Sequence, residues 1–403
     1  MFSKSLFFGR KPLVFLAGSF LTMGLGSLLA IKSKSGSELP LEEENPPKVA
    51  ETQRLPHVEM GQVTSITVSR DGNQAYAASF GAGTLSILDR DPITGTLKFR
   101  KSLKAAHHPR LVAFRLSPDG KFGAGSDFGA DNLILFSRDP KTGDLKEVDH
   151  VNKNKVMPEL GFCIDNVFSP DSRYLYAVGS MALTVFEIVD SKLVHLESHT
   201  DPNQGQAAGA IMSGARGVAI SPNGKWVYSS WNQSGSLVVH QRDPDTGLLT
   251  LAQALRAGGK VPVKGLTSVM HCTVSPDGNF VYTSGGRFGG ADAVCCFKVG
   301  IEGNLTLVQQ LLGDDLPEGF GGGNEIAISP KGDLVAVACT TADQLARFSR
   351  DRNTGRLEAI DSVQSGEEDT PGAAGVCFDP TGRDILVADE NSNSIVVFRN
   401  IRQ

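Results

Sequence analysis

The sequence predicts an all-β fold made of repeated four-stranded antiparallel units. Residues 218–251 contain four short runs in which apolar and polar residues alternate. Alternation at period two is typical of strands with one buried face. Turn-forming residues separate the runs, as in Pro222-Asn223-Gly224 and in Asp243-Pro244-Asp245-Thr246-Gly247, because Gly, Asn, Asp and Pro adopt turn dihedrals that β-branched residues resist. The rest of the chain contains copies of this unit.

The turn after the first strand of the unit occurs seven times, at intervals of 48 to 54 residues. The copies are Ser69-Arg70-Asp71-Gly72, Ser117-Pro118-Asp119-Gly120, Ser169-Pro170-Asp171-Ser172, Ser221-Pro222-Asn223-Gly224, Ser275-Pro276-Asp277-Gly278, Ser329-Pro330-Lys331-Gly332 and Asp379-Pro380-Thr381-Gly382. Four-stranded repeats of this length are typical of a β-propeller, in which the repeats form the blades of a closed ring. We therefore predict seven blades.

The seventh copy ends after its third strand, at Ser394-Ile395-Val396-Val397-Phe398. The residues before the first copy, around Glu51 to Val58, lie where a fourth strand would be found. We expect this amino-terminal segment to complete the last blade and close the ring. A corner such as Asp351-Arg352-Asn353-Thr354-Gly355 follows the third strand in four copies, but it is degraded in copies three and five.

The first 31 residues have the pattern of an export segment. Lys4, Arg10 and Lys11 precede 19 uncharged, mostly apolar residues at 13–31, as in a signal peptide or an uncleaved membrane anchor. Residues 32–50 are polar, contain three prolines and have no periodicity, so we expect a flexible linker. Residues 51–403 form the propeller domain. We expect that domain to be exported, as a periplasmic, extracellular or membrane-tethered protein.

Charge and cysteine content exclude several classes of function. Residues 51–403 hold 33 Lys and Arg against 40 Asp and Glu, and no basic patch indicates a nucleic-acid partner. None of the six cysteines has the spacing of a zinc site. They are expected to be small buried residues on strands, although an exported protein could link two of them across blades. We predict neither a metal nor a cofactor, and we expect a monomer.

The strand order indicates where a functional site would lie. The repeated turns all fall on one face of the ring, whereas the loops after the second strands and the crossovers between blades fall on the other. The loops on this second face differ between copies, and variable loops are the usual location of function in a repeat scaffold. Residues just before the innermost strands would point at the mouth of the central channel, with Arg287 leaning in from its loop. The best placed are Arg110, Asp165, Arg216, His271 and Glu325.

This set of residues suits an anionic, oxygen-rich ligand. Arginine binds carboxylate or phosphate through paired hydrogen bonds. A histidine or glutamate could take a proton from water, and an arginine could stabilise the oxyanion of an opening ester. Polar residues are also ordinary at a wet channel mouth, so each residue has a purely structural alternative.

The repeats VAFRLSPDGKF…FGADNLILFSRDPKTGDLKEV and CTVSPDGNFVYTSGGRFGGADAVCCF resemble the lactonase family of seven-bladed propellers. That family includes a type of 6-phosphogluconolactonase and carboxymuconate cycloisomerases. The resemblance covers about residues 55–400. It implies the propeller fold and a lactone substrate.

The resemblance also implies roles for individual residues. The family's His-Pro-His resembles His108-Pro109-Arg110, with the second histidine replaced, and two family arginines are matched by Arg216 and Arg287. The family's glutamate before the fifth blade falls near His271, so Glu325 is the candidate to replace it. His271, Glu325 and His108 are thus the predicted catalytic residues. Arg110, Arg216, Arg287 and Asp165 are the predicted substrate-binding residues.

Two functions remain open from the sequence. The first is a lactonase-like hydrolase that opens a sugar-acid or related lactone at the channel mouth. The second is a non-catalytic exported propeller that binds a protein or an anionic polysaccharide, which the replaced histidine and the missing glutamate favour.

Overall fold

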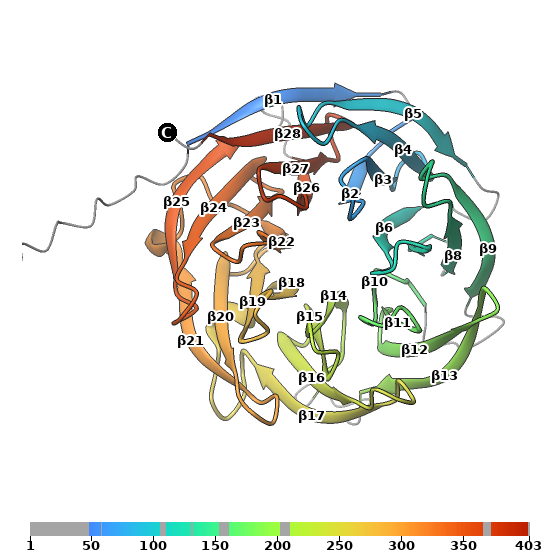
Figure 1. Cartoon of the computed structure of the whole chain (residues 1–403). Coiled ribbons are helices and arrows are strands. Elements are labelled where there is room, and N and C mark those ends of the chain that lie inside the picture. Colours follow the sequence, from blue (N-terminus) through green and yellow to red (C-terminus); the bar gives the residue numbers. More distant parts are fainter. Residues whose placement is uncertain are drawn as a thin grey trace, which may run out of the picture. The chain divides into compact units, whose positions relative to one another are not determined.

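Seven four-stranded antiparallel sheets form the described part of the chain and surround a common centre (Figure 1). The structure, a computed structural model, describes residues 48–57, 59–104, 110–129, 132–152, 161–201, 210–365 and 372–401. In each blade the first strand is innermost and the last lies at the rim (Figure 1). The prediction of an all-β, seven-bladed propeller is confirmed.

The first three blades contain consecutive strands. Blade 1 consists of β2 (Val63–Val68), β3 (Gln74–Ser79), β4 (Thr84–Arg90) and β5 (Leu97–Leu103). Blade 2 consists of β6 (Leu111–Leu116), β7 (Phe122–Asp127), β8 (Asn132–Arg138) and β9 (Leu145–Asn152). Blade 3 consists of β10 (Asp165–Phe168), β11 (Tyr174–Val178), β12 (Ala182–Val189) and β13 (Lys192–Thr200).

The next three blades repeat this order, with two short 3₁₀ helices, η2 (Lys264–Leu266) and η3 (Gly313–Asp315), in the connections. Blade 4 consists of β14 (Ala215–Ile220), β15 (Trp226–Trp231), β16 (Ser236–Arg242) and β17 (Leu249–Arg256). Blade 5 consists of β18 (Val269–Val274), β19 (Phe280–Gly285), β20 (Ala293–Val299) and β21 (Leu305–Leu312). Blade 6 consists of β22 (Gly323–Ile328), β23 (Leu334–Cys339), β24 (Gln344–Arg350) and β25 (Leu357–Gln364).

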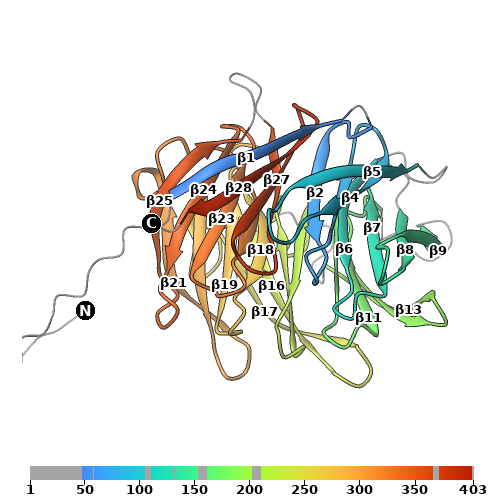
Figure 2. The same cartoon turned by 45° about the horizontal axis from the view of Figure 1, so that its top comes forward.

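Blade 7 combines both ends of the propeller unit. Its three carboxy-terminal strands are β26 (Ala373–Phe378), β27 (Asp384–Asp389) and β28 (Ser394–Ile401), and its outer strand is β1 (Lys48–Pro56). β1 runs antiparallel to β28, from Lys48 opposite Ile401 to Pro56 opposite Ser394 (Figure 2). The expected closure is therefore confirmed. The strand begins three residues before the predicted domain start at residue 51, while residues 1–47 lie outside the described residues.

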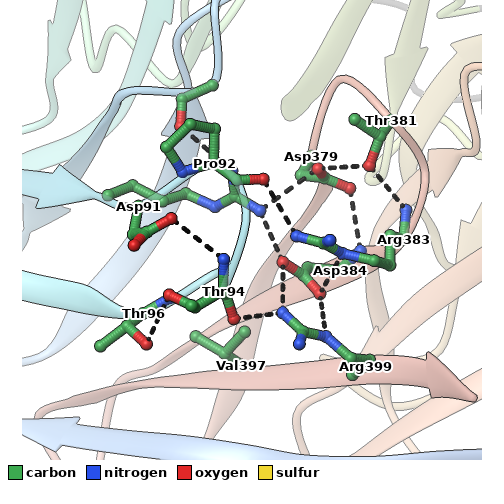
Figure 3. A network of polar contacts seen from close by, with 12 residues as sticks. Asp91, Pro92, Thr94, Thr96, Asp379, Thr381, Arg383, Asp384, Val397 and Arg399 are labelled. Carbon is green, nitrogen blue, oxygen red and sulfur yellow. Dashed lines mark hydrogen bonds and ion pairs between the residues drawn. The ribbon is translucent and has the colours of Figure 1, made fainter.

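A buried ion pair reinforces the closure between blades 1 and 7. Arg90 Nη2 lies 2.5 Å from Asp384 Oδ2 and 3.2 Å from Asp379 Oδ2, and all three side chains are almost fully buried. Arg399 Nε donates to the other oxygen of Asp384 at 2.8 Å (Figure 3). Six of the repeated turns begin with serine. The seventh begins instead with Asp379, the residue that pairs with Arg90.

The repeated turns join neighbouring blades. The Nε atoms of Arg138, Arg242 and Arg350 donate to the hydroxyls of Tyr76, Tyr176 and Tyr282 in the preceding blades, at 2.5–2.7 Å. Each of these arginines also donates to the glycine carbonyl of its own blade's first turn. The three tyrosine hydroxyls in turn donate to glycine carbonyls in the corners that follow the third strands, at Gly143, Gly247 and Gly355. Both kinds of repeated turn therefore take part in joining the blades.

Apolar side chains fill the spaces between blades. One cluster packs Tyr228 and Val239 of blade 4 against Val281 and Phe297 of blade 5. Five of the six cysteines are buried and Cys377 is half-buried. Cys163 lies just before β10, and Cys295 and Cys296 share β20, so the expectation that every cysteine lies on a strand is wrong for Cys163. Within the described ranges, no helix is long and apolar enough to cross a membrane.

Candidate functional site

A cavity of about 430 Å³ lies among the innermost strands of all seven blades. Its wall comes from β2, β6, β10, β14, β18, β22 and β26, and loops that follow second strands contribute Phe80, Phe128, Arg287, Phe288 and Glu390. These elements belong to the face on which the sequence places the variable loops. This cavity is therefore the candidate site.

One register position supplies much of the polar lining. It lies four residues before the first residue of each repeated turn, and its occupants are Ser65, Ala113, Asp165, Gly217, His271, Glu325 and Gly375. The five of these that carry a side chain all line the cavity. The strand repeat thus brings together Asp165, His271 and Glu325, which are more than 50 residues apart in sequence.

The side chains of Asp165 and His271 meet across blade 4. His271 Nε2 lies 3.2 Å from Asp165 Oδ2, and the same oxygen accepts a hydrogen bond from the backbone N–H of Val218 at 3.2 Å. Gly217 leaves the necessary space, because a Cβ at this position would lie 2.7 Å from His271 Cδ2. The Nδ1 atom of His271 is buried and has no hydrogen-bond partner in the structure. Asp165 therefore fixes the orientation of the imidazole and leaves Nδ1 available.

Arg115 of β6 bridges two of the three acidic residues that line the cavity, Asp165 and Glu325. Its Nη2 atom lies 3.1 Å from Asp165 Oδ1 and 2.8 Å from Glu325 Oε1. Glu325 Oε2 accepts from the backbone N–H of Val376 at 3.2 Å, so both of its oxygens are engaged. Burial would raise the pKa of Asp165, but the charge of Arg115 and the bond from His271 lower it. Burial would likewise lower the pKa of Arg115, but Asp165 and Glu325 raise it.

Two arginines lie close to the Phe288 ring. The guanidinium carbons of Arg216 and Arg287 are 4.5 and 5.4 Å from its centroid, within the range of cation–π attraction. Arg287 is neutralised, since its Nη2 atom donates to both carboxylate oxygens of Glu390 at 2.8 Å. Arg216 has no carboxylate partner in the described residues, and its Nε atom is buried without a hydrogen bond.

The charge of Arg216 is therefore uncompensated inside the cavity. Burial, and secondly the like charge of Arg287, lower its pKa, yet a guanidinium stays charged at neutral pH. An anion bound here would remove an electrostatic cost that the empty protein carries. A β-bulge places the side chain, since the pairing of β14 with β15 skips from Ala215 to Gly217, and bulges re-aim side chains.

The structure brings together five of the seven predicted site residues. Asp165, Arg216, His271, Arg287 and Glu325 all line the cavity. They do not lie as predicted relative to the strands, because Asp165, Arg216, His271 and Glu325 are inside the first strands rather than before them. Asp165 is buried and holds His271, so it is not placed to bind substrate directly. Arg110 is exposed, outside the cavity lining, and lies over the Phe80 ring at 5.3 Å. His108 lies outside the described residues.

Two charged residues of the site were not predicted. The first is Arg115, which lies two residues before its repeated turn. Its counterparts in the other blades are uncharged, namely Thr67, Val167, Ala219, Thr273, Ala327 and Cys377. A comparison of this position across the seven copies could therefore have identified Arg115 from the sequence. The second is Glu390, whose role depends on contact with Arg287 two blades away, and the sequence carries no signal for that contact.

The chain is similar in sequence to a known family and to a characterised relative. The chain matches the family described as "Lactonase, 7-bladed beta-propeller" over residues 45–159, 165–264, 263–370 and 317–402. It is 28% identical over 203 residues to the 6-phosphogluconolactonase of Bacillus subtilis strain 168, a match that covers 49% of this chain and 53% of the relative. The aligned region thus spans about half the length of that enzyme.

Solved structures share the fold at lower identity. The periplasmic gluconolactonase of Pseudomonas aeruginosa superimposes with a TM-score of 0.59 and 20% identity, covering 75% of this chain and 85% of that one. Hydrazine synthase of Kuenenia stuttgartiensis gives a TM-score of 0.65 and 18% identity, covering 88% and 98%. Proteins of different activity thus have this fold, so these likenesses bear on architecture alone. The family match extends over nearly all of the propeller, and the chain belongs to the lactonase family of seven-bladed β-propellers.

Proposed function

We propose that this protein is an exported hydrolase that opens a lactone in the central cavity, with sugar-acid lactones among the first candidates. The observation that carries the proposal is the placement of the Asp165–His271 pair in the same cavity as the uncompensated cation of Arg216. A hydrolase of this kind needs a base to activate water and a cation to stabilise the oxyanion. Family membership favours a lactone as the ester that is opened.

In the proposed reaction His271 is the general base. With Nε2–H donated to Asp165, the unprotonated Nδ1 takes a proton from water while the water oxygen bonds to the lactone carbonyl carbon. The carbonyl oxygen becomes an oxyanion, which the guanidinium of Arg216 stabilises. The ring C–O bond then breaks, and the proton on His271 passes to the departing ring oxygen. The product is the open hydroxy acid.

Glu325 and Arg287 have supporting roles in this proposal. Both oxygens of Glu325 already accept hydrogen bonds, from Arg115 and Val376, so it is less suited than His271 to accept a proton. Arg287 is paired with Glu390, so Arg216 is the stronger candidate to hold an anionic group of the substrate.

The proposed location favours a substrate without phosphate. The charged and apolar pattern of residues 1–31 is that expected of an export segment, whereas phosphorylated sugars are cytoplasmic metabolites. The B. subtilis relative is named for a phosphorylated lactone, and the P. aeruginosa neighbour for gluconolactone. We propose that the substrate of this chain is a lactone without phosphate.

Hydrolysis of a lactone panel by the full chain tests the proposal. Wild type, His271→Asn and Arg216→Met are compared at matched concentration, with Arg100→Met as a control at a surface ion pair. We expect hydrolysis above background that falls at least about 100-fold in His271→Asn, the scale of losing a general base. Background rates for every lactone and every variant would overturn the hydrolase and favour a non-catalytic binding propeller.

A further inference from the structure

Part of the cavity wall is apolar. Charged side chains come from every blade except blade 1, but blades 2 and 3 also contribute Val112, Ala113, Phe128 and Ile164 beside Arg115 and Asp165. These four side chains offer no hydrogen-bond donor or acceptor. The hydroxyls of a sugar placed against them would lose hydrogen bonds to water without replacement, which disfavours binding.

Aromatic rings form a row along this apolar side. Phe80 and Phe128 line the cavity from the loops after β3 and β7, and their centroids are 6.1 Å apart. Phe128 is 4.7 Å from Phe162, which precedes β10. Phe80 and Phe128 are only half-buried although large and apolar. Arg110 covers Phe80 at 5.3 Å and thereby helps to hold the start of the row in place.

We propose that Phe80 and Phe128 form a stacking subsite for an apolar ring, preferably aromatic, carried by the same ligand whose acid group binds Arg216. Phenylalanine offers a flat apolar face and no hydrogen bond, so it selects an aryl or other apolar ring over a polyhydroxylated one. This inference deepens the proposed function, because it names the class of lactone opened as one with an aryl or apolar ring beside its ester. The subsite can be tested by measuring ligand binding alone, without any lactone hydrolysis.

Binding of simple carboxylates to the full chain tests the subsite directly. Titration calorimetry compares 3-phenylpropionate, which carries an aromatic ring and a carboxylate, with propionate and gluconate. We expect 3-phenylpropionate to bind at least about 10-fold more tightly than either, since an aromatic pair adds attraction beyond that of the area that it buries. Equal or tighter binding of gluconate would overturn the inference.

The variants Phe128→Leu and Phe80→Leu test whether the ring of bound 3-phenylpropionate contacts these two side chains. Each should weaken 3-phenylpropionate binding about 3- to 10-fold, the equivalent of losing one aromatic contact, and leave gluconate unchanged. Two variants are used because either could perturb folding, which thermal unfolding checks. Phe99→Leu is the matched control, since Phe99 stacks on His57 outside the cavity. Unchanged 3-phenylpropionate affinity in both cavity variants would also overturn the subsite.

Hydrolysis separates this inference from the proposed function. Dihydrocoumarin, an aryl-fused lactone, should be opened with a higher kcat/KM than glucono-δ-lactone, and Phe128→Leu should reduce only the former. If neither lactone is hydrolysed while 3-phenylpropionate binds and responds to Phe128→Leu, the hydrolase is overturned and the subsite stands. Preference for glucono-δ-lactone would overturn the named substrate class and leave the hydrolase supported.

Discussion

His271 and Asp165 belong to blades 5 and 3, yet their side chains lie 3.2 Å apart across Gly217 of blade 4. All three residues occupy the same register position, in the consecutive blades 3, 4 and 5. A side chain on the middle blade would separate the outer two, because an added Cβ would lie 2.7 Å from His271 Cδ2 and 3.1 Å from His271 Cα. The missing side chain is therefore as much a part of the candidate site as the acid and the imidazole.

Gly217→Ala should abolish most lactone hydrolysis without unfolding the protein. The new methyl group would displace the imidazole from Asp165, and a displacement of about 1 Å can reduce a rate about 100-fold. Steady-state kinetics and thermal unfolding measure the two effects. Gly258→Ala is the control, since a methyl group there meets no atom within 4 Å. Full activity in Gly217→Ala would show that the Asp165–His271 contact is not needed.

Arg115→Met should destabilise the protein strongly at neutral pH. Removing Arg115 leaves Asp165 and Glu325 without their shared cation, and breaking a buried pair costs about 3–5 kcal/mol. The folded-state pKa of Asp165 lies below its ordinary value of 3.8. Its contribution to stability is therefore present above pH 3.8 and is lost as pH falls through the lowered pKa. The difference between wild type and variant should be largest near pH 7 and shrink in acid.

Urea unfolding at pH 7 and at pH 3 checks this expectation. Arg100→Met is a suitable comparison, because Arg100 pairs with the half-exposed Asp89 and Asp144, and surface pairs contribute about 1 kcal/mol or less. An equal loss of stability in the two variants would contradict the account of Arg115 as the counter-ion of two buried acids.

The fold could be predicted from sequence because its signals are local and repeated. The repeated turns have hydrogen bonds of their own, such as those from Ser117 to Asp119 and to the Phe122 carbonyl, and the number of copies of the turn gives the number of blades. The closing strand was predictable because copy seven lacks its fourth strand. The start of the first strand was misjudged in blades 3 to 6, where the predicted residues lie inside the strand. In blade 4 a bulge inserts one residue, at Arg216, and interrupts the alternation.

The candidate site was only partly predictable, because its contacts join residues from separate blades. Residues were correctly placed in the cavity wherever the repeat register puts them there, as with His271 and Glu325. The sequence could not show that Arg287 is neutralised by Glu390 while Arg216 is not, since that depends on how two loops lean across blade 6. Nor could it show that Asp165 faces His271 rather than a ligand, which depends on the empty space at Gly217.

Glu390→Gln should increase the affinity for anionic ligands. The substitution removes the charge that now neutralises Arg287, so two uncompensated guanidiniums would face Phe288. We expect gluconate to bind about 5-fold more tightly at low ionic strength, with the gain declining as salt screens the charges. Glu358→Gln, at an exposed position on β25, changes the net charge equally and serves as the control. Unchanged affinity in Glu390→Gln would indicate that Arg287 does not reach the ligand.

Asp343→Asn should stabilise the protein at alkaline pH. Asp343 lies in the loop after β23 and hydrogen-bonds to Asp389 of blade 7, and burial together with that like charge raises its pKa to about 6. An acid with a raised pKa contributes stability that is fully present below its unfolded pKa of 3.8 and is lost as pH rises through about 6. Asparagine imitates the protonated acid, so the variant should avoid this loss.

The expected gain is on the order of 2 kcal/mol at pH 8, because each unit of pKa shift corresponds to about 1.4 kcal/mol and the hydrogen bond from Gln364 to Asp343 is weakened in the variant. Below pH 4 the gain should vanish. Urea unfolding across pH 4–8 measures it, with Asp315→Asn as an exposed control. If the variant were less stable than wild type at pH 8, the hydrogen bonds to ionised Asp343 would stabilise the fold by more than the repulsion between Asp343 and Asp389 destabilises it. Ionisation of Asp343 at the junction between blades 6 and 7 would then not be a cause of lower protein stability at alkaline pH.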